Sequence, residues 1–210
     1  MQAKLRLALY SDQQEPGNPA MDRRLAALLG MPRPRIGYVA SGPDPDRRWY
    51  QRKVEHYARL GMDMTVFQGP GDPAGADDLL WTCDGIHLSG GNTFAFLGWL
   101  REQGVLPRLR QYALEGGVLI GESAGAILMT PDARSAALCG DEAAGTPEDA
   151  QALGLVPFRF WPHAGSGTGP ARQAILQPFP DIFACPDGSG IIVDGASIET
   201  FGPVRRLGLD

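Results

Sequence analysis

The stretch from residue 117 to residue 129 constrains this chain more than any other. Residues 117–120 (GVLI) are apolar, residues 121–125 read GESAG, and residues 126–129 (AILM) are apolar again. A G-x-S-x-G sequence between a strand and a helix is typical of a nucleophile elbow, a sharp turn that lifts one hydroxyl clear of the sheet edge. Glycine tolerates the positive φ that such turns need. The stretch therefore predicts strand, turn and helix, with Ser123 at a helix N-terminus whose free N–H groups can stabilise negative charge. The alternative is a glycine-rich turn with an incidental serine.

Apolar runs alternate with helical patterns along the first 130 residues. Expected strands cover residues 5–10, 35–40, 64–67, 85–89 and 117–120, and expected helices cover 22–29, 46–60, 93–100 and 105–115. Helix 46–60 is charged, and its expected inner residues are Trp49, Val54, Tyr57 and Leu60. The alternation favours an α/β fold with a mostly parallel sheet covered by helices on both faces. Ligands bind such sheets at the carboxyl ends of the strands, where Ser123 and the turn at Gly90-Gly91 both fall.

The second half of the chain is less regular. Residues 131–149 read as a surface loop with one helical turn, residues 158–162 as a strand and residues 172–177 as a helix. Residues 190–199 predict a hairpin that turns near Asp194-Gly195. Because neither an internal repeat nor a low-complexity linker interrupts the sequence, we expect a single domain over residues 1–210.

Composition narrows the classes of partner. A net charge of −5 and a pI near 5.2 argue against nucleic acid or an anionic membrane as the main partner. No apolar stretch is long enough to span a bilayer, and the N-terminus reads as a first strand rather than a signal peptide. The three cysteines are far apart in the sequence. This predicts a protein of the reducing cytoplasm rather than one held by a disulfide framework. Histidines are few and scattered, so we expect no metal and no cofactor.

A serine nucleophile needs a base, and histidine is the usual one at neutral pH. His56 lies in the charged helix and is expected to be a solvated surface residue. His87 lies inside a predicted central strand, where a packed core histidine is the commoner outcome. His163 follows a predicted strand and opens a glycine-rich stretch, the kind of position that presents catalytic side chains. By elimination, His163 is the predicted base.

A third group should orient the imidazole and stabilise its cation. Asp187 is the best candidate because it sits in a turn just before a strand, although Asp-Gly is also a common turn sequence. Asp194 and Glu199 are weaker candidates, on a hairpin turn and on the outer face of that hairpin. The resulting order of serine, histidine and aspartate differs from the order in α/β-hydrolases, so the elbow belongs to another lineage.

Four segments together resemble the peptidase E family of aspartyl dipeptidases. Residues 86–94 (IHLSGGNTF) resemble its G-G-N-T segment, and residues 121–126 (GESAGA) resemble the G-x-S-A-G-A motif that it shares with cyanophycinase. Residues 152–158 (ALGLVPF), followed by Pro162-His163, are similar to the stretch that leads to the family's catalytic histidine. Residues 186–188 (PDG) resemble the family's P-E-G, with aspartate in place of glutamate. The segments occur in the family's order over most of the chain.

The resemblance implies a three-layer α/β sandwich, similar to class I glutamine amidotransferases, and a serine peptidase that uses no cofactor. The implied roles are Ser123 as nucleophile, His163 as general base and acid, Asp187 as orienting carboxylate, Gly91 or Gly90 with Ala124 as oxyanion hole, and Asn92 beside the substrate.

Two features depart from the family's pattern. The family carries a longer segment after its histidine and uses an arginine there to grip the substrate's aspartate, whereas here the segment shortens to residues 164–170. Arg172 is the nearest candidate for that arginine, and a helix-surface cation is the alternative. The glycine-rich segment is also a candidate lid. Glu122 is the second departure, because a carboxylate is not expected directly before the nucleophile. Its side chain either points away from the site or interacts with a substrate amine.

Three functions stay open. The first is a cytoplasmic serine peptidase, with homodimer formation open, that releases the N-terminal residue of dipeptides or short peptides, Asp-X among them, through an acyl-enzyme. The second keeps the nucleophile and acts on β-aspartyl peptides, as cyanophycinase does, or on another small amide or ester. The third is a binding protein of the same fold without catalysis.

Overall fold

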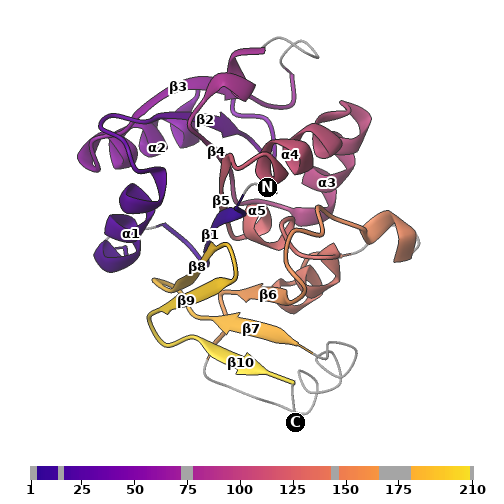
Figure 1. Ribbon diagram of the computed structural model, residues 1–210. Helices are drawn as coiled ribbons and strands as arrows, with labels where there is room; N and C mark the ends of the chain where they lie inside the picture. Colours follow the sequence, from indigo (N-terminus) through magenta and orange to yellow (C-terminus); the bar gives the residue numbers. More distant parts are fainter. Residues whose placement is uncertain (1–3, 14–16, 72–77, 143–146, 166–180, 209–210) are drawn as a thin grey trace.

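The computed structural model describes residues 4–13, 17–71, 78–142, 147–165 and 181–208 (Figure 1). In chain order the elements are β1 (Arg6–Tyr10), α1 (Pro19–Leu29), β2 (Arg35–Val39), α2 (Arg48–Arg59), β3 (Asp63–Gln68), η1 (Asp78–Thr82), β4 (Gly85–Leu88), α3 (Thr93–Glu102), α4 (Val105–Leu114), β5 (Val118–Glu122), α5 (Ala124–Ile127), η2 (Ala133–Cys139), η3 (Pro147–Ala150), β6 (Arg159–Pro162), β7 (Ile182–Cys185), β8 (Gly190–Asp194), β9 (Ser197–Phe201) and β10 (Arg205–Leu207). Within these ranges no helix has both the length and the apolarity needed to cross a membrane.

A seven-stranded sheet in the order β3-β2-β4-β5-β1-β8-β9 forms the centre of the molecule. The strands from β3 to β1 are all parallel to their neighbours, while β8 and β9 add an antiparallel hairpin beside β1. The hairpin turns after Asp194, as expected from the sequence. The mostly parallel α/β sheet is thus confirmed, and the carboxyl ends of β1, β4 and β5 lie together at one edge.

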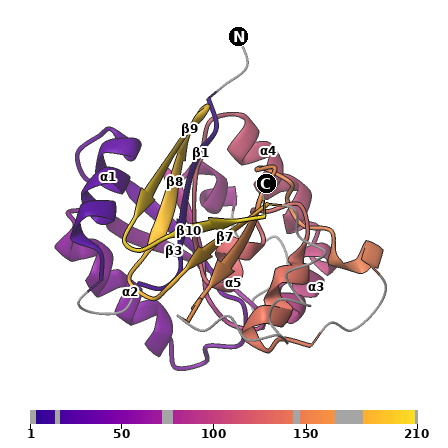
Figure 2. The same ribbon diagram turned by 90° about the horizontal axis from the view of Figure 1, so that it is seen from below.

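Helices cover both faces of this sheet, which gives three layers (Figures 1 and 2). Successive side chains of a strand point to opposite faces, and β1 shows the division. Ala8 and Tyr10 join the core formed with α1 and α2, while Leu7 and Leu9 join the core formed with α3, α4 and α5. All four side chains are buried, so the central strand is apolar on both sides, as expected in a doubly covered parallel sheet.

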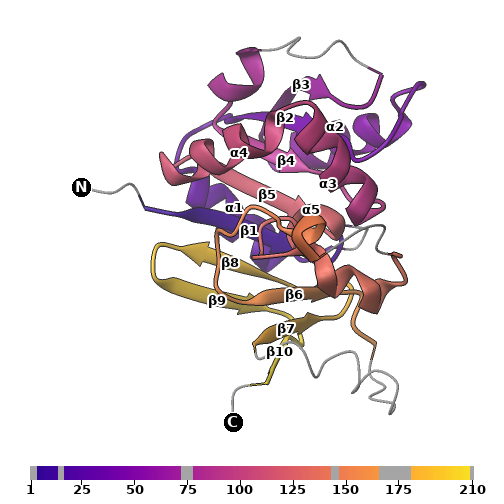
Figure 3. The ribbon, with the colours of Figure 1, turned by 90° about the vertical axis from the view of Figure 1, so that its right-hand side faces the viewer.

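A second, three-stranded sheet in the order β10-β7-β6 lies beside the main one (Figure 3). Strands β6 and β7 are parallel, with Pro162 opposite Cys185, and β10 is antiparallel to β7. Phe160 and Phe183 carry this sheet into the larger core. The strand at β6 was expected, whereas β7 and β10 were not among the expected strands.

Two expectations for side chains and loops were wrong. Tyr57 is fully buried on the inner side of α2, as predicted, but Trp49 is 48% exposed and packs between the guanidinium groups of Arg48 and Arg52. It lies in the first turn of α2, with its ring partly exposed to solvent. The first part of the expected surface loop at residues 131–149 is instead packed on the protein, because the 3₁₀ helix η2 buries three of its residues. The expected helix at residues 172–177 falls outside the described residues.

The approach of α5 to β4 predicts a large cost for added bulk. A Cβ on Gly125 would overlap the carbonyl of Leu88, so Gly125→Ala should lower the free energy of unfolding by about 1–3 kcal/mol. Gly98 in α3 is the control, because a Cβ there meets nothing, and Gly98→Ala should raise stability by up to about 1 kcal/mol. Urea unfolding measures both variants. A Gly125→Ala variant as stable as the wild type would contradict the close approach.

Candidate active site

Ser123 occupies a strained turn between β5 and α5. Its backbone has φ 50° and ψ −109°, a conformation that few residues other than glycine adopt. The flanking glycines make the turn possible, since a Cβ on Gly121 would lie 2.5 Å from the amide nitrogen of Ala126. The neighbouring strands hold the turn from both sides, because Ser123 N–H donates to the Tyr10 carbonyl and Gly125 N–H to the Ser89 carbonyl. Local strain of this kind clusters at functional sites.

The structure brings together the three residues that the sequence selected as a triad. The Ser123 hydroxyl lies 2.9 Å from Nε2 of His163, and Nδ1 of His163 lies 2.5 Å from Oδ1 of Asp187. With its proton on Nδ1, the imidazole donates to the carboxylate and accepts the serine proton at Nε2. The His163 and Asp187 side chains are 40% and 65% exposed. This is the geometry of a nucleophile, a general base and an orienting acid.

Polar residues directly after β1 support the histidine, and the sequence reasoning missed them. His163 has a left-handed backbone with φ 55°, and its N–H donates to the Ser11 hydroxyl at 2.8 Å. That hydroxyl donates in turn to the Cys185 carbonyl at 2.9 Å. Asp12 accepts from the N–H of Gly188 at 2.7 Å and so holds the turn that carries the acid. Ser11 and Asp12 both follow a central strand, at the sheet edge where Ser123 lies. That position was the signal available in the sequence.

Two backbone N–H groups beside Ser123 form a candidate oxyanion hole. Gly90 packs against the serine, with its Cβ position 3.5 Å from Cβ of Ser123. Gly91 has φ 142°, and a side chain there would overlap the hydroxyl of Ser41, so the turn requires glycine. The N–H groups of Gly91 and Ala124 have no hydrogen-bond acceptor among the described residues. They remain available to an oxygen that develops negative charge.

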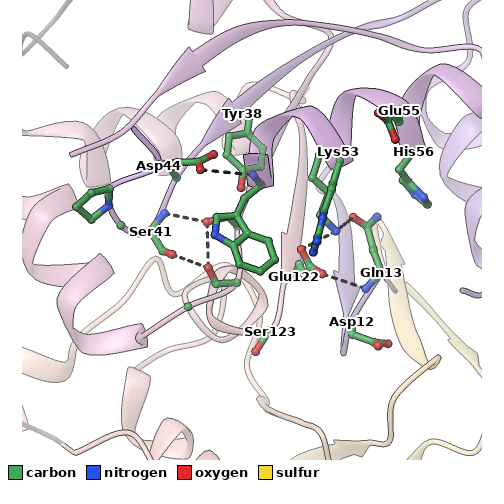
Figure 4. A pocket seen from close by; sticks show the side chains of 18 of the residues that line it. Asp12, Gln13, Tyr38, Ser41, Asp44, Lys53, Glu55, His56, Glu122 and Ser123 are labelled. Carbon is green, nitrogen blue, oxygen red and sulfur yellow. Dashed lines mark hydrogen bonds and ion pairs between the residues drawn. The ribbon is translucent and has the colours of Figure 1, made fainter. Parts of the chain in front are cut away.

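A pocket of about 990 Å³ opens beside Ser123 (Figure 4). Ser123 and His163 line it on the sheet side, and one face of α2 forms its opposite wall. It is large enough for a small peptide, because ligand pockets usually span some 300–1,000 Å³. The other lining residues are Asp12, Gln13, Tyr38, Ala40, Ser41, Gly42, Pro43, Asp44, Trp49, Arg52, Lys53, Glu55, His56, Arg59, Ser89, Gly90, Gly91 and Glu122.

Glu122 lies on the pocket wall and does not point away from it. Its Oε2 atom is 2.7 Å from the Lys53 ammonium, and its Oε1 atom accepts from the N–H of Gln13 at 3.1 Å. Asn92 plays a different part, because its side chain caps α3 by accepting from Ala95 N–H and does not line the pocket. Arg172 and most of the segment 164–170 lie outside the described residues.

The other two histidines lie on β4 and α2 and are not part of the row formed by Ser123, His163 and Asp187. His87 is fully buried in β4, with Nδ1 2.9 Å from the Tyr57 hydroxyl and its ring stacked on Tyr38. Burial lowers the pKa of His87 well below its ordinary value, so the ring is neutral at pH 7. This agrees with the core role expected from the sequence. His56 is half-buried, packs edge-on against Tyr57 and lines the pocket, so the expectation of a solvated surface residue was wrong.

Comparison with known proteins agrees with this geometry. A model of peptidase family S51 matches residues 7–201 of the chain. Peptidase E of Shewanella denitrificans is 26% identical over 156 residues, which are 69% of this chain and 64% of the relative. Peptidase E of Pasteurella multocida is 29% identical over 136 residues, which are 60% of this chain and 57% of the relative. The chain thus spans less than two thirds of the length of these relatives. The resemblance to the peptidase E family noted in the sequence is confirmed.

Solved structures share the fold over nearly the whole chain. A protein of Listeria monocytogenes EGD-e superposes with a TM-score of 0.70 at 20% identity, and the match covers 98% of this chain and 100% of that protein. A peptidase from an acI-B1 Actinobacterium gives a TM-score of 0.69 at 18% identity, with coverage of 100% and 95%.

The contact between Ser11 and His163 predicts that the base depends on this hydroxyl. Ser11→Ala leaves the N–H of His163 without its acceptor, and we expect Ser123 to react about tenfold more slowly with a fluorophosphonate. Ser135→Ala is the matched control, because the buried Ser135 hydroxyl donates to the Phe160 carbonyl outside the pocket. Both variants should lose about 1–3 kcal/mol of stability, but only the first should lose reactivity. Equal labelling rates in the two variants would refute this support.

Proposed function

Since the chain belongs to peptidase family S51, we propose that it is a serine peptidase that releases the N-terminal residue of dipeptides or short peptides. The observation that carries the proposal is the aligned row of Ser123, His163 and Asp187, with contacts of 2.9 and 2.5 Å. A peptide of two or three residues also suits the size of the pocket beside the serine.

The proposed reaction begins with attack of the Ser123 hydroxyl on the scissile carbonyl. His163 takes the serine proton at Nε2, while Asp187 holds Nδ1–H and stabilises the imidazolium. His163 then gives this proton to the leaving amine, the C–N bond breaks, and an acyl-enzyme ester remains on Ser123. A water molecule, deprotonated by the same imidazole, hydrolyses the ester and restores the serine.

The carbonyl oxygen becomes negative in each tetrahedral intermediate and needs donors at that moment. We assign this role to the N–H groups of Gly91 and Ala124, with Gly90 as the neighbour that shapes the turn. Removal of one such donor in a serine peptidase costs roughly 10²–10³ in kcat. The strained Ser123 backbone fits the same purpose, because it presents the hydroxyl to the carbon and the Ala124 N–H to the oxygen of one substrate carbonyl group.

Glu122, Arg172 and Asn92 are the candidates for contact with the substrate's N-terminal residue. Glu122 faces the pocket and has lone pairs beyond those used by Lys53 and Gln13, so it can accept from a substrate amine. A preference for N-terminal aspartate would depend on Arg172, which lies outside the described residues. Contact of Asn92 with substrate would require its side chain to leave its capping position on α3.

The cytoplasm is the proposed compartment for this activity. Cys83, Cys139 and Cys185 form no disulfide with one another, and two of them are buried, which suits a reducing environment. A binding protein without catalysis is a poorer fit, because it would have no need of a strained serine aligned with a histidine and a carboxylate.

A panel of Asp-X, Glu-X, Ala-X and β-Asp-X dipeptides tests the proposal. We expect the wild type to hydrolyse at least one α-linked dipeptide, and Ser123→Ala to lose at least about 10⁴-fold in kcat while keeping the wild-type circular dichroism spectrum. N-acetylation of the best substrate should abolish turnover if release is confined to a free N-terminus. Preference for β-Asp-X would transfer the chain to the cyanophycinase-like alternative. Full activity of Ser123→Ala would refute the serine mechanism.

A further inference from the structure

A carboxylate directly before the nucleophile is electrostatically unfavourable for the proposed reaction. Glu122 ends β5, and its side chain lies in the same pocket as Ser123 and His163. Negative charge there opposes the oxyanion that forms at the substrate carbonyl, and it also favours the protonated form of a nearby imidazole, which cannot act as a base. The site therefore needs a compensating positive charge.

Lys53 on α2 supplies that charge from the opposite wall (Figure 4). Its ammonium lies 2.7 Å from Oε2 of Glu122 and 3.2 Å from Oε1 of Gln13, which holds it in place. The Lys53 and Glu122 side chains are only 13% and 15% exposed, so solvent screens this pair much less than a surface pair. Gln13 contributes twice, because its backbone N–H also donates to Oε1 of Glu122.

The other titratable groups around Glu122 do not replace this charge. His87 on β4 comes closest, with Nε2 3.8 Å from Oε2 of Glu122, but its burial keeps it neutral. Tyr38 on β2 and Tyr57 on α2 also interact with the carboxylate, and burial raises the pKa of both phenols far above pH 7. Among the described residues, Lys53 is thus the cation that forms an ion pair with Glu122.

We propose that Lys53 is a positioning residue of the active site: it pins Glu122 to the pocket wall and cancels its charge, so that no uncompensated carboxylate stands directly before Ser123. Lys53 acts through Glu122 and makes no contact with the reacting atoms. The inference rests on the proposed serine mechanism, since the charge matters only if Ser123 reacts through His163.

The test compares Lys53→Met, Glu122→Gln and the double variant by the rate at which a fluorophosphonate labels Ser123 from pH 5 to 9. This readout needs no knowledge of the peptide substrate. We expect Lys53→Met to label about tenfold more slowly at pH 7, with its half-maximal rate moved upward by about 0.5–1 pH unit, because an unpaired carboxylate stabilises the imidazolium. The double variant should recover to within about threefold of the wild type, because the uncompensated charge has gone.

Arg52→Met is the matched control, since Arg52 is the next cation on the same wall and stacks on Trp49 instead of pairing with Glu122. Its half-maximal pH should stay at the wild-type value. A wild-type rate and profile in Lys53→Met would overturn the inference. So would a double variant as slow as Lys53→Met, which would give Lys53 a purely structural role. A wild type that does not label at all would instead refute the proposed function.

Discussion

The close contact between α5 and the ends of β4 and β5 is the constraint on which the rest of the site depends. No side chain fits at Gly121 or Gly125, and Ser123, midway between them, has a positive φ. This geometry projects the Ser123 hydroxyl from the sheet edge and leaves the Ala124 N–H without a partner among the described residues. The fold therefore places the proposed nucleophile and one proposed oxyanion donor in a single turn.

The small second sheet positions the other two residues of the proposed triad, His163 and Asp187. Strands β6 and β7 run parallel and end side by side at Pro162 and Cys185. His163 and Asp187 follow these ends by one and two residues, so the parallel pairing helps to bring the proposed base and its carboxylate together. Ser11, at the end of β1, ties this sheet to the main one through His163 and Cys185. The residues of the proposed triad thus come from strand ends in two sheets that share one core.

Much of this arrangement was predictable from the sequence, because its signals are local. The alternation of strands and helices, the elbow at Ser123 and the turn that carries Asp187 each follow from a few neighbouring residues. Strand β7 was missed because its four apolar residues give too little periodicity, and β10 was missed because two of its three residues are arginines. The pairing of Lys53 with Glu122 joins residues 69 positions apart, and Ser11 contacts His163 across 152 positions. Such contacts arise from the packing of elements, which no local pattern encodes.

The most direct test of the account is to find which residue a fluorophosphonate modifies, by mass spectrometry of proteolytic peptides from the wild type and from His163→Ala. The account predicts one adduct, on Ser123, in the wild type, and labelling slowed by at least about 10³-fold in a folded His163→Ala variant. An adduct on another residue, or equal labelling of the two proteins, would contradict the central claim that Ser123 is a nucleophile activated by His163.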